Sequence, residues 1–158
     1  MISGLEELLQ RYPFFRDMDA GVRKTVAGCA ANERIDAGQY IFREGETAEK
    51  FFLLRDGQVA LEICVAGRRP LIVDTVRAGE IFGWNWIIPP YSWRADARAT
   101  ERSRLLSLDA KCLRGKMESD HLLGYEMYQR FFPVIAKRLE GARLRLIDLY
   151  GHPDEQQL

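Results

Sequence analysis

The chain has 158 residues, of which 47% are hydrophobic and 29% are charged, and its formal net charge is zero. These values are typical of one globular domain and exclude a disordered chain. A protein that binds nucleic acid mainly through phosphates usually carries a basic excess, which this chain lacks. Its start shows no basic stretch followed by an apolar run, and no segment approaches the roughly 18 apolar residues that a membrane span needs. The sequence therefore predicts a cytoplasmic protein that binds neither DNA nor a membrane.

Residues 1–32 are predicted to form short helices. Leu5, Leu8 and Leu9 recur at helical spacing, and a turn is expected near Tyr12-Pro13. A second helix is predicted from about Ala20 to Ala31, with its apolar residues on one face.

Residues 33–110 change to a pattern typical of strands, in which short apolar segments lie between regularly spaced glycines. The predicted strands are Tyr40–Phe42, Phe51–Leu54, Val59–Val65, Leu71–Val76, Ala95–Ala99 and Arg104–Leu108. Asp56-Gly57 lies between two of these runs and predicts a β-hairpin with a type I′ turn, and Gly67-Arg68 is expected at another hairpin tip. Seven or eight short strands at this spacing predict a mainly β sandwich or roll.

Residues 111–151 are predicted to be helical, with one long segment from about His121 to Tyr150. Pro133 should kink this segment or divide it into two helices, and Gly151 should end it. Apolar residues alternate steps of four and three, which predicts a parallel homodimer seam formed by Ile135, Leu139, Ala142, Leu146 and Leu149. The alternative is that this stripe packs on the strands of its own chain.

The three cysteines are Cys29, Cys64 and Cys112, an odd number of residues far apart in sequence. They form neither a disulfide framework nor a metal-ligand spacing, and their apolar neighbours predict buried structural thiols. The two histidines, His121 and His152, lie outside the predicted strands, and no catalytic motif follows a strand. We therefore expect no enzyme activity, no metal and no cofactor.

Three glycine-containing segments carry a resemblance to a known family. They are Ala37-Gly38-Gln39-Tyr40-Ile41-Phe42-Arg43-Glu44-Gly45-Glu46, then Phe51-Phe52-Leu53-Leu54-Arg55-Asp56-Gly57-Gln58-Val59, then Ala78-Gly79-Glu80-Ile81-Phe82-Gly83. In this order they closely resemble the cyclic-nucleotide-binding domain of catabolite-activator-type transcription factors, cyclic-nucleotide-dependent kinases and gated channels.

The resemblance runs from about Phe14 to Tyr150. It implies a double-stranded β-helix, or jelly-roll, with short N-terminal helices and a long C-terminal helix, as a single domain over residues 1–158. The family's helix-turn-helix would need about 50 residues more after Tyr150. We therefore expect a stand-alone member that does not bind DNA.

In that family a cassette, here residues 79–95, binds the ligand's phosphate through a Phe-Gly-Glu turn, a short helix and an Arg-Ala or Arg-Ser pair. This chain has Phe82-Gly83-Trp84, so an indole replaces the carboxylate that accepts from the ribose hydroxyl. Arg94-Ala95 has a spacing that suits the cassette arginine. Counting back from the next strand instead places Trp93 at that position and turns Arg94 to another face.

The resemblance also implies an arginine on the long helix, matched by Arg138, followed by hydroxyl residues that read the base. Ala142-Arg143 occupies those positions, so binding of cyclic AMP in the family manner is not expected. The predicted ligand-binding residues are Gly83, Trp84, Asn85, Arg94, Ala95 and Arg138.

All three tryptophans, Trp84, Trp86 and Trp93, lie within ten positions of one another, and Tyr91 lies among them. They line a pocket for a different small ligand, fill the former pocket as core, or form an exposed patch for a protein partner. The implied function is a non-catalytic ligand-sensing regulatory module for a small anionic or nucleotide-like effector, with an unidentified protein partner. The alternative is a dimerisation or interaction scaffold without a ligand.

Overall fold

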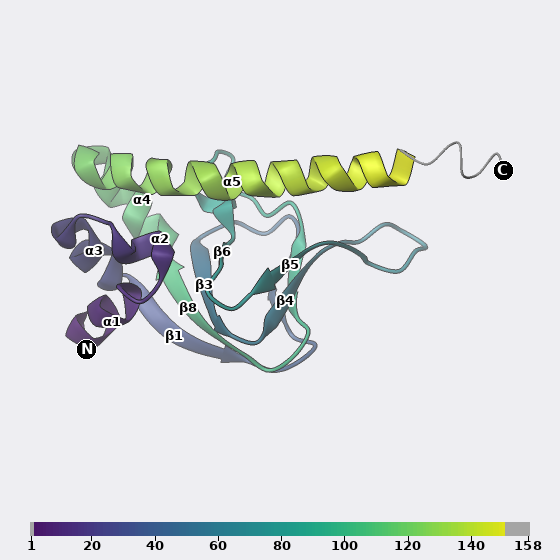
Figure 1. Cartoon of the computed structure of the whole chain (residues 1–158), viewed down its shortest axis with the longest axis horizontal. Coiled ribbons are helices and arrows are strands. Elements are labelled where there is room, and N and C mark those ends of the chain that lie inside the picture. Colours follow the sequence, from purple (N-terminus) through teal and green to yellow (C-terminus); the bar gives the residue numbers. More distant parts are fainter. Residues whose placement is uncertain (1, 151–158) are drawn as a thin grey trace.

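The structure is a computed structural model that describes residues 2–150. Within them, eight strands form two four-stranded antiparallel sheets that close into a roll (Figure 1). The first sheet has the order β1-β8-β3-β6 and the second β2-β7-β4-β5. The strands are β1 (Ala30–Ile35), β2 (Tyr40–Phe42), β3 (Lys50–Asp56), β4 (Gln58–Ile63), β5 (Leu71–Arg77), β6 (Ile81–Phe82), β7 (Asp96–Ala99) and β8 (Ser103–Asp109). The predicted mainly β jelly-roll is confirmed.

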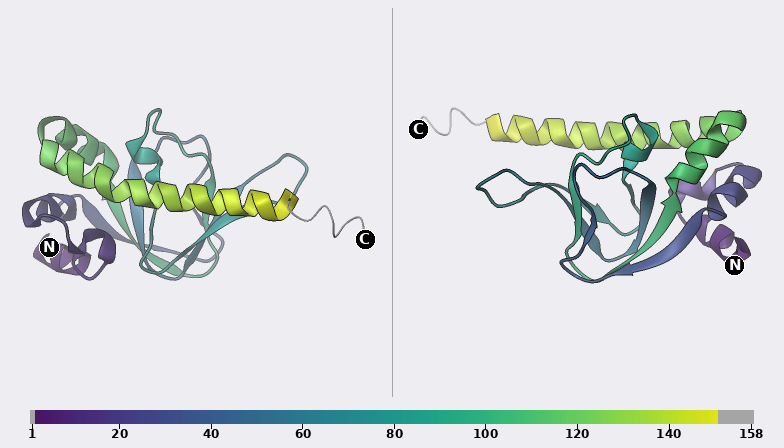
Figure 2. Two further views of the ribbon diagram at one scale, coloured as in Figure 1. Left: turned by 45° about the horizontal axis from the view of Figure 1, so that its top comes forward. Right: turned by 180° about the vertical axis from the view of Figure 1, so that it is seen from behind.

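Helices cover one end and one side of this roll. They are α1 (Ile2–Leu9), α2 (Pro13–Arg16), α3 (Ala20–Ala27), the short 3-10 helix η1 (Trp84–Ile87), α4 (Ala110–Ser119) and α5 (His121–Tyr150). The N-terminal helices, α4 and the start of α5 gather at the same end, and α5 then runs along the roll and past it (Figures 1 and 2). The β4–β5 hairpin extends in the same direction as the end of α5.

The boundary between N-terminal helices and roll differs from the prediction. Helix α3 ends at Ala27 rather than near Ala31, and the first strand begins at Ala30 rather than at residue 33. Ala30 and Ala31 form register pairs with Leu108 and Ser107 of β8. The β1–β8 ladder therefore extends past the change in apolar spacing, which the sequence pattern alone could not show.

The predicted hairpin at Asp56-Gly57 is wrong. Strands β3 and β4 belong to different sheets, so this dipeptide is a corner between the sheets rather than a turn within one. Gly57 has φ of 101°, and a Cβ there would lie 2.2 Å from Ser103 Oγ. Glycine is thus required both by conformation and by the approach of β8. The hairpin expected at Gly67 is confirmed, since β4 and β5 pair directly.

Helix α5 continues through Pro133 without the expected break. Proline removes one helical hydrogen bond. On either side of it, the buried side chains of Met127 and Phe131 and the half-buried Ile135 pack against the core. This packing keeps both halves of α5 on one line. The helix stop expected at Gly151 lies outside the described residues.

Two aromatic clusters fill the core. One lies inside the roll, where Phe42 stacks on Trp93 with ring centroids 3.8 Å apart and Phe52 stacks on Phe82 at 5.2 Å. The other lies under α5, where Phe131 meets Phe51 at 5.0 Å and Trp86 at 5.3 Å. The second cluster attaches both η1 and α5 to the roll.

The prediction that the cysteines are buried is wrong. Cys64 and Cys112 are exposed, and Cys29 is half-buried. Cys64 follows the last residue of β4 and so lies in the β4–β5 loop, and Cys112 lies in the first turn of α4. Apolar neighbours in sequence do not bury a residue whose own side chain points to the other face.

Candidate effector-binding site

The site begins where the chain turns from β6 into η1. Gly83 adopts φ of 87°, a left-handed conformation that costs little only for glycine. A Cβ at this position would lie 3.0 Å from Cη2 of Trp93. The turn and the close approach of the indole together require glycine here.

A neighbouring loop holds the return segment of the cassette. The amide of Gly45 donates to the Trp93 carbonyl at 2.9 Å, and the Trp93 amide donates to the Glu46 carbonyl at 2.9 Å. The amide of Ala48 donates to the carbonyl of Tyr91 at 2.7 Å. Residues 45–48 and 91–93 therefore run side by side, which fixes where Arg94 and Ala95 emerge.

Asp96 anchors the same loop from the start of β7. Its buried carboxylate accepts from the Glu44 amide at 2.7 Å and lies 3.3 Å from Nε of Arg43. Burial by itself would raise the pKa of Asp96, but the Glu44 amide, the Cys64 thiol and Arg43 together hold that pKa below its ordinary value. The charged carboxylate thus stabilises the loop that supports the cassette.

A cavity of about 160 Å³ lies between the cassette, the second sheet and α5. All six residues predicted to bind a ligand line it. The lining residues are Phe42, Leu61, Val73, Asp74, Gly83, Trp84, Asn85, Arg94, Ala95, Arg138 and Ala142. Arg94 borders the cavity with an exposed side chain, whereas Trp93 is buried and stacks on the cavity-lining Phe42. The register of the cassette arginine stays a prediction.

The two arginines at the cavity differ in their partners. Arg138 donates to the Asp74 carboxylate of β5 and to the Ile81 carbonyl, the latter at 3.2 Å, and Arg145 also lies 3.6 Å from Asp74. The side chain of Arg94 is exposed and takes part in no hydrogen bond or ion pair with any residue between 2 and 150. Among the described residues, the cavity therefore has an ion-paired arginine, Arg138, on its helix side and an arginine without a partner, Arg94, on its cassette side.

Asp74 was missed from the sequence. It is the one acidic residue within the apolar run from Leu71 to Val76, and that interruption was the available signal. Its partner on α5 lies 64 residues away, so only the folded chain shows the pairing.

The three tryptophans do not all fit the same interpretation: one lines the cavity and two belong to the core. Trp84 is half-buried and lines the cavity, as expected for a pocket wall. Trp86 and Trp93 are buried, with exposures of 0% and 3%, and belong to the two aromatic clusters of the core. Of the three indoles, Trp84 therefore lines the cavity and the other two do not.

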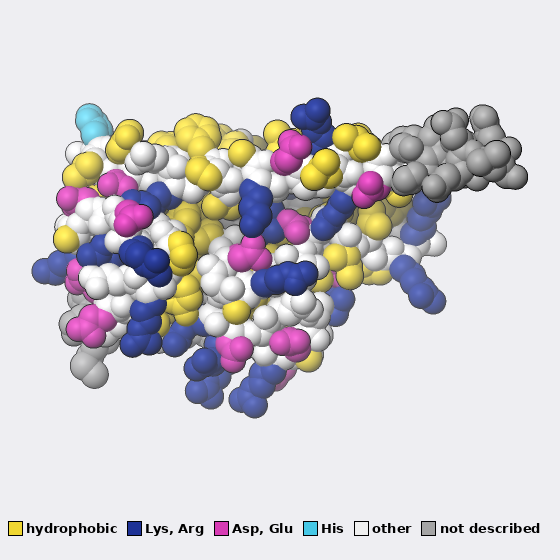
Figure 3. Space-filling view, in the orientation of Figure 1, with side chains coloured by type: hydrophobic (Ala, Val, Ile, Leu, Met, Phe, Trp, Pro, Cys, Tyr) yellow, Lys and Arg dark blue, Asp and Glu magenta, His cyan; other side chains and the backbone are white. Residues whose placement is uncertain are grey.

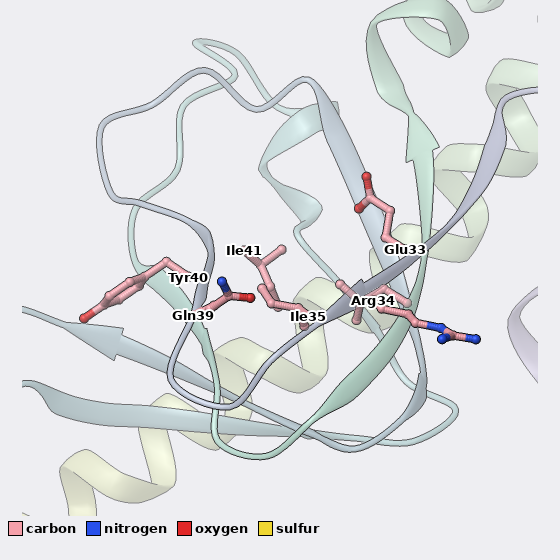
Figure 4. A pocket seen from close by; sticks show the side chains of 7 residues that line it. Glu33, Arg34, Ile35, Gln39, Tyr40 and Ile41 are labelled. Carbon is pink, nitrogen blue, oxygen red and sulfur yellow. The ribbon is translucent and has the colours of Figure 1, made fainter.

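A larger hollow of about 580 Å³ lies elsewhere, between the edges of β1 and β2. In Figure 4, Ile35, Gln39 and Ile41 lie close together in it, whereas the polar ends of Tyr40 and Arg34 point in opposite directions. Because its polar groups do not converge on a common point, we place the candidate site in the smaller cavity.

The residues predicted for a dimer seam lie on two kinds of surface. Ile135 packs against the core of its own chain, and Ala142 borders the cavity. Leu139, Leu146 and Leu149 are exposed by 69%, 56% and 74%. Apolar side chains gather along α5 in Figure 3. The alternative from the sequence was that this stripe packs on its own roll. Ile135 does so, whereas these three leucines do not.

Two features are absent from the described part of the chain. No cluster of three or more His, Cys, Asp or Glu side chains among residues 2–150 is arranged to hold a metal ion. Over the same residues, no helix has an apolar stretch sufficient to traverse a bilayer.

An antiparallel β-roll with a glycine-turn cassette and a helix across its cavity defines a class of ligand-binding regulatory domains. A family model of the cyclic nucleotide-binding domain matches residues 32–120, more than half of the chain. The chain belongs to the cyclic nucleotide-binding domain family.

Solved structures agree with this assignment. A protein from Geobacter metallireducens assigned to cyclic nucleotide binding is 28% identical, with a TM-score of 0.76, and the match covers 85% of this chain and 97% of that chain. A cyclic nucleotide-binding domain from Methylobacillus flagellatus has a TM-score of 0.75 over 93% of this chain and 83% of that chain. At 16% identity, the second shows the shared fold alone.

Curated relatives are larger proteins. Cyclic nucleotide-gated ion channel 18 of Arabidopsis thaliana is 31% identical over 63% of this chain and 15% of the channel. A cAMP-dependent protein kinase regulatory subunit of Schizosaccharomyces pombe is 27% identical over 66% of this chain and 24% of the subunit. The chain thus matches about a quarter or less of these proteins, and it is related to regulatory, ligand-sensing modules.

Proposed function

We propose that this chain is a non-catalytic, cytoplasmic sensor that binds a small anionic effector in the cavity between its cassette and α5. The observation that carries the proposal is the guanidinium of Arg94, which pairs with no residue between 2 and 150 and lies beside a cavity that Arg138 borders from the helix side. A free cation at the edge of an apolar cavity is arranged to receive an anion that enters it.

The residues that line the cavity support one class of effector. An indole at Trp84 offers a stacking surface but cannot accept a hydrogen bond from a ribose hydroxyl. Ala142 offers no hydroxyl from α5 toward a base. We therefore propose a ligand that pairs an anionic group with a compact flat or apolar group, held differently from cyclic AMP in this family. Because the cavity measures about 160 Å³, a full nucleotide requires α5 or the β4–β5 hairpin to move outward.

Signal transmission follows from the contacts of Arg138. An anion that binds Arg138 competes with Asp74, which ties α5 to β5. Such a ligand has different affinities for the paired and unpaired arrangements, and this difference shifts the position of α5.

We further propose that α5 pairs with α5 of a second copy in a parallel homodimer. The exposed seam leucines support this proposal, and further exposed side chains continue the same alternation of three and four residues toward the start of the helix. These are Tyr125, Tyr128 and Phe132, exposed by 61%, 47% and 67%. A stripe of this length on a polar background suits a two-helix interface.

Ligand binding is tested by thermal unfolding of the full chain with cyclic AMP, cyclic GMP, cyclic di-GMP and a panel of small carboxylates and phosphates. A ligand at 100 times its dissociation constant adds about 2.7 kcal/mol, which should raise Tm by roughly 5–10 °C. Arg94→Ala should abolish the shift, whereas Arg34→Ala, on the far hollow, should keep it. An unchanged shift in Arg94→Ala removes this residue from the site.

Dimerisation is tested by light scattering at micromolar concentration. The wild type should show twice the chain mass, and Leu139→Glu should show the mass of one chain. Leu144→Glu is the matched control, because Leu144 is 53% exposed but lies off the seam. A monomeric wild type, or equal effects of the two glutamates, would contradict the seam.

A second candidate function is a scaffold without a ligand. The burial of Trp93 favours it, because this indole stacks on the cavity-lining Phe42 and fills the space beside Gly83. A stable dimer that responds to no compound in the panel would support the scaffold and oppose the sensor.

A further inference from the structure

Two cysteines that lie far apart in sequence meet outside the effector-binding site. Sγ of Cys29 lies 3.6 Å from Sγ of Cys112, although 83 positions separate the residues. Cys29 lies between α3 and β1, and Cys112 lies in the first turn of α4. Cys112 is exposed and Cys29 is half-buried, so solvent-borne reagents reach the pair.

The backbone already holds these residues together. The amide of Asp109 donates to the carbonyl of Cys29 at 2.9 Å, and the Asp109 carboxylate accepts from the Cys112 amide at 2.9 Å. A disulfide has an S–S distance of about 2.05 Å, so each sulfur needs to move by less than about 1 Å. Side-chain rotation supplies such a movement without rearrangement of the sheet.

We propose that Cys29 and Cys112 form a reversible redox site, which closes to an intramolecular disulfide by exchange with a small-molecule disulfide of the glutathione class. The sulfur of Cys112, as a thiolate, attacks one sulfur of this reagent, breaks its S–S bond and releases one thiol after protonation. Cys29 then loses its proton, attacks Sγ of Cys112 and releases the second thiol. Both cysteines are oxidised, and the reagent is reduced to two thiols.

The surroundings assign the order of these steps. Burial and the hydrogen bond to Cys112 raise the pKa of the Cys29 thiol to about 11, and the nearby ammonium of Lys116 opposes this effect. Lys116 Nζ lies 3.8 Å from the Cys29 sulfur. Cys29 therefore rests as a protonated donor to Cys112, and the exposed Cys112 reacts first.

The bond would join the start of β1 to α4, which in turn holds η1. Arg114 of α4 donates to the carbonyl of Trp86 at 2.8 Å and to that of Ala48 at 3.1 Å. Oxidation thus restrains α4, the helix whose Arg114 holds η1 of the cassette in place. Because the cross-link closes a loop of more than 80 residues, it should raise Tm by about 10 °C.

The experiment uses the full chain, reduced and then equilibrated with mixtures of reduced and oxidised glutathione. Free thiols are counted by alkylation and intact mass, and the cross-linked peptide is identified after digestion. The expected result is a fall from three thiols to one, a mass loss of roughly 2 Da, and reversal by dithiothreitol. The Cys64→Ser variant should still form the Cys29–Cys112 disulfide, whereas the Cys112→Ser variant should not.

Persistence of three thiols, or glutathione adducts and intermolecular dimers without a Cys29–Cys112 peptide, would overturn the proposal. Both outcomes are read on the wild type, so they do not depend on how any variant folds.

Discussion

Gly83 meets two structural requirements, a left-handed backbone and the absence of a Cβ next to Trp93, and replacing it by alanine tests both. Gly83 and Gly79 both have left-handed backbones, with φ of 87° and 91°. A Cβ at Gly79 would meet nothing within 4 Å, whereas one at Gly83 would lie 3.0 Å from the Trp93 ring. Trp93 is buried and stacked on Phe42, so the ring has no room to move away. Gly79→Ala is therefore the matched control for conformation without contact.

The left-handed conformation costs about 1–2 kcal/mol in both variants, offset in part by the roughly 0.4–1 kcal/mol that alanine contributes by restricting the unfolded chain. The contact with Trp93 adds about 1–3 kcal/mol at Gly83 only. We expect Gly79→Ala to lose about 1 kcal/mol and Gly83→Ala about 2–4 kcal/mol. Urea unfolding followed by tryptophan fluorescence measures both. Equal midpoints for the two variants would refute the argument that the indole defines this turn.

Two further predictions concern the elements that support the cassette. Because the pKa of Asp96 is lowered in the folded state, its contribution is present above the unfolded value of about 3.9 and is lost as pH falls through the folded value. Asp96→Asn should therefore lower the free energy of unfolding by about 1–3 kcal/mol at pH 7. In urea titrations, the difference in stability between the variant and the wild type should narrow toward pH 3. A difference that does not change with pH would contradict a role for the charge of Asp96. Arg114→Met should lower the free energy of unfolding by about 1–3 kcal/mol because the Trp86 carbonyl loses its donor. Lys111→Met, at an exposed position on the same helix, should change that free energy by less than about 0.5 kcal/mol. Similar effects of both variants in urea titrations would show that these hydrogen bonds contribute little.

The sequence predicted the roll and its covering helices because glycine spacing and apolar alternation are local signals. It did not predict which strands share a sheet. Asp56-Gly57 has the composition of a hairpin turn, yet the contact of Gly57 with Ser103 on β8 makes it a corner. The preference of a dipeptide for a turn is local, whereas the approach of a strand 46 positions away is a property of the whole fold.

The six cassette and helix residues could be named from spacing and from resemblance, and the fold brings them to one cavity. Asp74 could not, because its importance depends on Arg138 from a distant helix. The cysteine pair is similar: Cys29 and Cys112 have unremarkable neighbours in sequence, and only the pairing of β1 with β8 brings their sulfurs together.

Because helix α5 continues unbroken to Tyr150, a small tilt of the helix at the cavity displaces its far end by a larger distance. Arg138 lies near the middle of this helix, and about 18 Å of stiff rod separates it from Tyr150. A tilt of about 10° around that point displaces the far end by roughly 3 Å, comparable to the diameter of a water molecule. In the proposed sensor, the helix thus acts as a lever that converts the exchange of one ion pair into a movement at the interface with the proposed second copy.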